Sequence, residues 1–161
     1  MNILNLLFTK DGLIYQIAKN KSIVEEKSYF VDEESPENFI SDMLDKVLLL
    51  QRFDEIHVIS ALNHFTLMPE GFSEHEAGFD LIAFNAPVDK EKEELMLSIN
   101  EKFKIQFYYT FPKHFYKKIK ELALPVQFNF SGEKFLNSIN NKNSKEIHIN
   151  LYHNQCEFFA I

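Results

Sequence analysis

Two adjacent residues near the N-terminus have types that could support chemistry. Asp11 and Gly12 form a short polar bend between two apolar runs, within residues 8–17. Glycine lets the backbone approach an anion closely, and a neighbouring acid can position a metal ion, so such a bend could hold phosphate. The same pair suits the turn of a β-hairpin, because both residues tolerate positive φ.

The surroundings of this bend favour the hairpin. The bulky Leu13 follows Gly12, and the four glycines of the chain are too far apart in sequence to form a glycine-rich loop. We therefore predict that Asp11 and Gly12 are the two turn residues of a hairpin. The sequence predicts no nucleotide binding, no cofactor and no metal site.

Other residues with chemical potential are isolated. His75 lies between two glutamates, but Ser73 and Glu76 have the spacing of a helix capping box, which we favour over a metal site. The single cysteine, Cys156, excludes an intramolecular disulfide and a multi-cysteine zinc site. It lies in a predicted strand, where a buried, inert thiol is the common case.

A basic and aromatic segment runs from Lys102 to Lys120. It contains six lysines, no acid and seven Phe or Tyr residues, the ingredients of a surface for single-stranded nucleic acid. Lys113, Lys117 and Lys120 fall on one stripe of a predicted helix and are the candidate nucleic-acid surface. We favour a solvated helix whose aromatic residues face the core, and keep RNA binding as the alternative.

Composition sets broader limits. The 161 residues suit one domain with a sizeable core. The net charge of -7 opposes binding to nucleic acid and to anionic membranes. No stretch approaches the roughly 20 apolar residues needed to span a bilayer. These features predict a cytoplasmic protein with no membrane partner.

Hydrophobic periodicity predicts the elements that must position these residues. The opening strands form an antiparallel meander, and a helix follows, with Ser35 as its cap and Pro36 as its first residue. Residues 88–100 fit either a strand or a helix, and we favour a strand. Predicted strands are 2–8, 13–19, 22–31, 55–60, 65–69, 104–111 and 126–130, and predicted helices are 36–51, 112–123 and, capped by Ser131, 131–140.

The last 16 residues read as a hairpin with two different faces. Ile147, Ile149 and Leu151 alternate with His148, Asn150 and Tyr152. Phe158 and Phe159 are adjacent on the returning strand, so one aromatic ring should point to each face. The candidate partner surface is Phe158, Phe159 and Ile161.

The hairpin pattern also repeats the start of the chain. NLLFTKDGLIYQI, starting at Asn5, matches INLYHNQCEFFAI, starting at Ile149, in its alternation of apolar strand, polar turn and apolar strand. The segments ILNLLFTKDGLIYQIA, FTLMPEGF, DLIAFN and EIHINLYHNQCEFFAI resemble the DUF3822 family, a bacterial group known chiefly from Bacteroidetes. The order βββαβα resembles the ribonuclease-H-like units of the actin-like ATPase superfamily.

The resemblance implies an α/β fold with a mixed sheet and helices. Residues 1–145 would form a ribonuclease-H-like domain, and residues 146–161 a hairpin that starts a second repeat. In that superfamily the first hairpin carries an Asp-x-Gly-Thr-like phosphate loop. Here Asp11 and Gly12 are adjacent, and Leu13 replaces the hydroxyl residue, so the resemblance does not carry nucleotide chemistry over to this chain.

The expected function is non-catalytic interaction or scaffolding. The expected partners are another protein, or a second copy of the chain, bound through the C-terminal strand. RNA binding through Lys102–Lys120 is the alternative, and a nucleotide-dependent enzyme completed by a second half is less favoured. Whether the chain is complete or part of a longer protein is left open.

Overall fold

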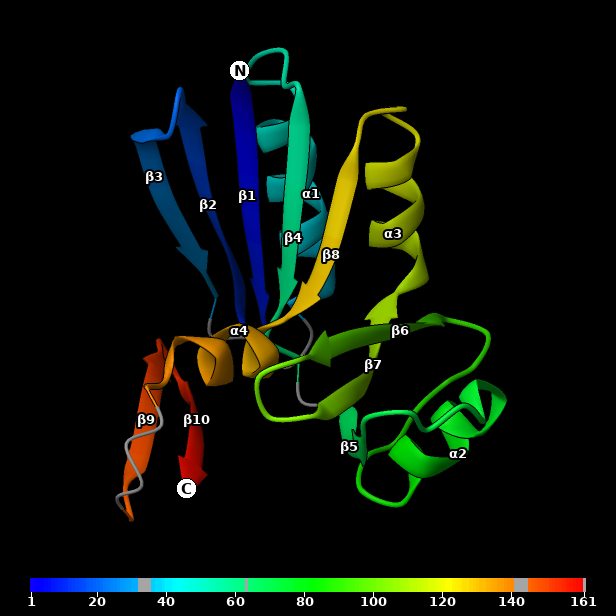
Figure 1. Cartoon of the computed structure of the whole chain (residues 1–161). Coiled ribbons are helices and arrows are strands. Elements are labelled where there is room, and N and C mark those ends of the chain that lie inside the picture. Colours follow the sequence, from blue (N-terminus) through cyan, green and yellow to red (C-terminus); the bar gives the residue numbers. More distant parts are fainter. Residues whose placement is uncertain (32–35, 63, 141–144, 161) are drawn as a thin grey trace.

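The computed structural model describes residues 1–31, 36–62, 64–140 and 145–160, and its central element is a five-stranded mixed sheet (Figure 1). The strand order is β3-β2-β1-β4-β8. β1, β2 and β3 form an antiparallel meander, β4 lies parallel to β1, and β8 lies parallel to β4. The bounds are β1 (Asn2–Thr9), β2 (Gly12–Lys19), β3 (Ser22–Phe30), β4 (Glu55–Ser60) and β8 (Val126–Phe130).

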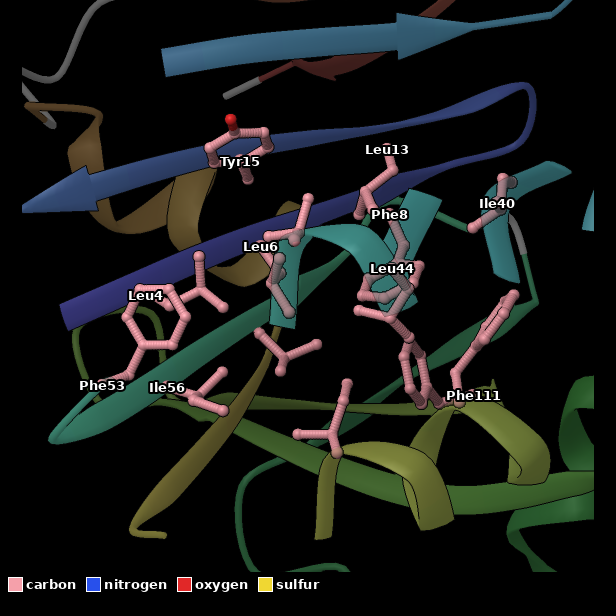
Figure 2. Close-up of a cluster of buried hydrophobic side chains, with 14 of the residues drawn as sticks. Leu4, Leu6, Phe8, Leu13, Tyr15, Ile40, Leu44, Phe53, Ile56 and Phe111 are labelled. Atoms are coloured by element: carbon pink, nitrogen blue, oxygen red, sulfur yellow. The ribbon is translucent and has the colours of Figure 1, made fainter. Parts of the chain in front are cut away.

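Two helices pack on one face of this sheet. They are α1 (Glu37–Leu48) and α3 (Lys113–Lys120). Buried residues at helical spacing on α1 meet the alternating inward residues of β1 and β2, which places apolar side chains from both elements in one core (Figure 2). The buried members include Leu4, Leu6, Phe8, Leu13, Tyr15, Ile40, Leu44, Val47, Phe111 and Phe115.

A second, smaller sheet is inserted between β4 and α3. Its strands run in the order β5-β7-β6, all antiparallel, and its aromatic residues form a second core cluster with Phe130. The bounds are β5 (Phe65–Pro69), β6 (Glu93–Asn100) and β7 (Ile105–Pro112), with a short 3₁₀ helix (His75–Ala77) and α2 (Gly78–Ala83) between β5 and β6.

The chain ends with α4 (Ser131–Ser138) and a two-stranded hairpin of β9 (Ile147–Tyr152) and β10 (Gln155–Ala160). In Figure 1 these elements lie below the main sheet, at the end toward which β1 and β4 point. The observed order confirms the predicted α/β fold with its βββαβα unit and closing hairpin. Within the described residues, no helix is long and apolar enough to cross a membrane.

Several local predictions were wrong in detail. Thr9 pairs with Gly12 across the first hairpin, so its turn residues are Lys10 and Asp11, one position earlier than predicted. Positive φ occurs instead in the next turn, at Asn20 and Lys21.

The predicted helix starts and ends also shift. Pro36 is the N-cap of α1 and not its first residue, and Ser35 lies outside the described residues. The predicted capping box at Ser73 and Glu76 is wrong, because the short helix there begins after Glu74 without a side-chain cap. α1 ends at Leu48 and α3 at Lys120, earlier than predicted.

Candidate functional site

The C-terminal hairpin presents an apolar face that no described residue covers. β9 and β10 pair with each other and with no other described strand. Their register places Leu151 opposite Cys156, Ile149 opposite Phe158, and Ile147 opposite Ala160. These six residues lie on one side of the hairpin and all are exposed; we call them the outer face.

The exposure of the outer face is large for apolar side chains. Leu151 is 76% exposed, Ile147 71%, Phe158 68% and Ile149 61%. Scattered exposed apolar residues are ordinary, whereas a contiguous patch marks a contact surface in soluble proteins. The three cross-strand pairs make this patch contiguous.

The opposite, inner face of the hairpin is held against the domain by polar contacts and one aromatic pair. The Phe159 ring packs on Phe135 with 5.5 Å between the ring centroids. The Gln155 side chain accepts a hydrogen bond from the Lys10 amide (2.9 Å) and donates one to the Ala61 carbonyl (2.7 Å). The hairpin is therefore fixed in orientation, with its apolar side outward.

A glutamate of β10 explains a further wrong prediction. The Ser131 hydroxyl donates to the Glu157 carboxylate and does not cap α4, whose N-cap is Phe130. The Tyr152 hydroxyl donates to the same carboxylate over 3.1 Å. Burial raises the pKa of Tyr152, and the neighbouring Glu157 raises it further.

The first hairpin turn meets the last one directly. Asp11 Oδ2 lies 2.8 Å from His153 Nδ1, and the His153 ring stacks on Phe30 with centroids 4.2 Å apart. Partial burial by itself raises the pKa of Asp11, but hydrogen bonds from His153 and Thr9 outweigh that effect and hold the pKa below its ordinary value of 3.8. The Asp11 carboxylate is thus engaged by the protein itself.

Gly12 has a structural reason to be glycine. A Cβ atom at Gly12 would lie 2.2 Å from the Tyr29 carbonyl oxygen and 3.2 Å from Phe30 Cα on the neighbouring strand. Both are backbone atoms, so they could not move aside without breaking the sheet. Close packing of β2 against β3 accounts for this residue.

The predicted partner residues lie in different environments. Phe158 is on the outer face, Phe159 is half-buried on the inner face, and Ile161 lies outside the described residues. Cys156 is exposed, so the prediction of a buried thiol was wrong. The candidate surface omitted Ile149 and Leu151, although the alternation of apolar residues in β9 was the signal that could have found them.

The three lysines of the predicted stripe do not form one free surface. Lys113 donates to the Lys90 carbonyl over 2.8 Å, while Lys117 and Lys120 are exposed on α3. Beside them, Lys118 pairs with Asp45 of α1 over 2.8 Å. Five of the seven aromatic rings of the segment are buried and none is fully exposed; the buried ones are Phe107, Tyr108, Tyr109, Phe111 and Phe115. The aromatic platform that stacking on bases requires is therefore in the core.

Comparisons with known proteins agree with this fold. A family model described as "Protein of unknown function (DUF3822)" matches residues 1–161. A solved protein from Bacteroides thetaiotaomicron VPI-5482, with an actin-like ATPase fold and unknown function, superposes with a TM-score of 0.76 at 17% identity. That match covers 99% of this chain and 65% of the other, so the chain spans less than two thirds of that protein's length. The likeness confirms an actin-like ATPase fold.

Another solved structure is less similar. It is a ROK family protein from Streptococcus pneumoniae TIGR4 in complex with sucrose, with a TM-score of 0.42 and 14% identity. That match covers 81% of this chain and 34% of the other. No curated protein matches the sequence.

Proposed function

The chain belongs to the DUF3822 family, and from this premise we propose that it is a non-catalytic interaction protein whose contact surface is the outer face of the β9–β10 hairpin. The observation that carries the proposal is the outer face itself: six contiguous residues without a charge, four of them large and at least 61% exposed. Leaving apolar surface in water costs about 25 cal/mol per Å². Binding to another apolar surface removes that cost.

The hydrogen bonds of the first hairpin turn support a function that does not involve nucleotide binding. The Lys10 amide, which a phosphate loop would offer to an anion, donates to Gln155, and the Asp11 carboxylate is bonded to His153. A phosphate group would have to displace both contacts. The enzyme completed by a second half, and the binding of RNA, lack a comparable observation in their favour.

A second copy of the chain is the first partner to test. The outer face is uncharged, so two copies related by a two-fold axis can bring these faces together without electrostatic repulsion between them. Burying four large side chains contributes on the order of 10 kcal/mol, and association costs about 4–15 kcal/mol. Self-association should therefore be weak and depend on concentration.

Sedimentation velocity tests this contact surface. We expect the wild-type chain to shift from monomer toward dimer between about 10 and 500 µM, and Phe158→Lys to remain monomeric because its charge would be buried in the contact. Phe84→Lys is the matched control, since Phe84 is 84% exposed on a different element. A wild-type chain that stays monomeric throughout, or equal effects of the two substitutions, would refute self-association through the outer face.

Nucleotide binding gives a separate prediction. Titration with ATP and magnesium should show no saturable heat up to millimolar concentration, because the turn amide and the Asp11 carboxylate are already bonded within the protein. Saturable binding at micromolar ATP that weakens in Asp11→Ala would show that the turn is a phosphate site after all.

The same proposal places the protein in the cytoplasm of a bacterium. Two features support this. The single cysteine cannot form a disulfide within the chain, which fits a reducing compartment, and the sequence resembles a bacterial family. The solved protein with the same fold comes from a Bacteroides species.

A further inference from the structure

A cavity of about 540 Å³ lies beyond the ends of β1 and β4, on the side of α1 and α3. Its size is that of a small-molecule site. Parallel strands of α/β sheets place ligands at their carboxyl ends, which is where the lining residues Thr9, Lys10 and Leu62 are. Its apolar wall comes from β1 (Phe8), the two helices (Ile40 and Phe115) and two loops (Leu62 and Val88).

One wall of the cavity carries a fixed histidine. Glu93 accepts hydrogen bonds from the Thr110 hydroxyl (2.8 Å) and the Asp89 amide (2.8 Å), and its Oε1 lies 3.0 Å from His64 Nδ1. Because a carboxylate can only accept, this contact keeps the proton of the neutral imidazole on Nδ1. The other ring nitrogen, Nε2, is left as an acceptor without a partner among the described residues.

The charges around the cavity leave one cation unpaired. Glu37 lies 3.2 Å from the ring of His114, whose pKa burial lowers below its ordinary value of 6.5, and Asp89 pairs with Lys92 (3.6 Å). Glu93 is held by the contacts described above. Among the lysines and acids that line the described part of the cavity, only the Lys10 ammonium group has no partner, because the hydrogen bond of Lys10 to Gln155 is made by its backbone amide.

We propose that this cavity binds a small hydroxy acid with an apolar body. The apolar body packs against Leu62 and Val88, which line the cavity and are only half-buried, the carboxylate pairs with Lys10, and the hydroxyl donates to His64 Nε2. The two polar contacts use groups that have no partner among the described residues. The site is separate from the outer face of the hairpin, so its test stands apart from that of the proposed function.

Three matched probes test the proposal by titration followed in ¹H–¹⁵N spectra. 4-Hydroxybenzoate should bind with a dissociation constant on the order of 1 mM, as expected for about ten heavy atoms. 4-Hydroxybenzamide lacks the charge and benzoate lacks the hydroxyl, so each should bind about three- to fivefold more weakly, the effect of one exposed polar contact. Equal affinity for all three probes, or no binding of any, overturns the proposal.

Variants assign each contact to its residue. Lys10→Gln should abolish the difference between the acid and the amide, whereas Lys19→Gln, an exposed lysine at the other end of β2, should preserve it. His64→Phe should abolish the difference between 4-hydroxybenzoate and benzoate. Val88→Trp, from the half-buried rim, should block the cavity and prevent binding of all three probes. A difference that persists in its own variant, or full binding to Val88→Trp, overturns the assignment.

Discussion

Replacing Leu44 with alanine is expected to lower the free energy of unfolding by about 3 kcal/mol, within the range measured for buried leucines. Leu44 is fully buried where α1 packs on the main sheet, in the cluster that also contains Phe8 and Phe111. Two contributions make up this loss. The first is the hydrophobic free energy that burial of the removed methyl groups supplies, and the second is the cost of the cavity that the surrounding side chains leave unfilled. Figure 2 shows how closely these side chains surround the position.

Urea denaturation measures this loss, in a Phe158→Lys background so that self-association does not contribute. The control is Leu49→Ala at the end of the same helix, where the leucine is 84% exposed; its effect should stay within about 0.5 kcal/mol. Similar effects at the two positions would mean that α1 does not pack on the sheet as described.

Gly12→Ala is expected to destabilise the fold by about 3 kcal/mol, near the upper end for overpacking. The added methyl group would meet the Tyr29 carbonyl at 2.2 Å, and relief requires β2 and β3 to separate. The destabilisation comes from the steric clash and not from backbone strain, since Gly12 does not have a positive φ.

The matched control is Gly71, which is set by its backbone conformation and not by a lack of space. Gly71 has φ +87° and nothing within 4 Å of an added Cβ atom, and asparagine tolerates this conformation. Gly71→Asn should therefore change the free energy of unfolding by less than about 0.5 kcal/mol. If Gly12→Ala were equally mild, the structural reason for glycine in the first hairpin would be lost.

The elements that sequence predicted well are those whose side chains repeat with one clear period. The alternation in β9 placed Ile149 and His148 on opposite faces, as observed, because a strand turns successive residues to opposite sides. The stripe of α1 was equally clear, although its last turn was predicted too long. Residues 88–100 proved to hold β6 after a loop, which explains why their pattern looked mixed.

Other features could not be predicted because they depend on contacts between distant segments. Ser131 has the sequence position of a helix cap, but its hydroxyl bonds to Glu157, 26 residues away. The group formed by His64, Glu93 and Thr110 joins three segments, and no local spacing reveals it. The exposure of Cys156 likewise depends on which side of the hairpin faces the domain.

Cys156 provides the most direct measurement of the central claim, that the outer face is a contact surface. It is the only cysteine in the chain and lies on that face opposite Leu151. The rate of its reaction with a maleimide should fall as protein concentration rises, in proportion to the dimer fraction found by sedimentation, and should stay constant in Phe158→Lys. A wild-type rate that does not change while the chain associates, or a thiol protected even in the dilute monomer, would contradict the claim.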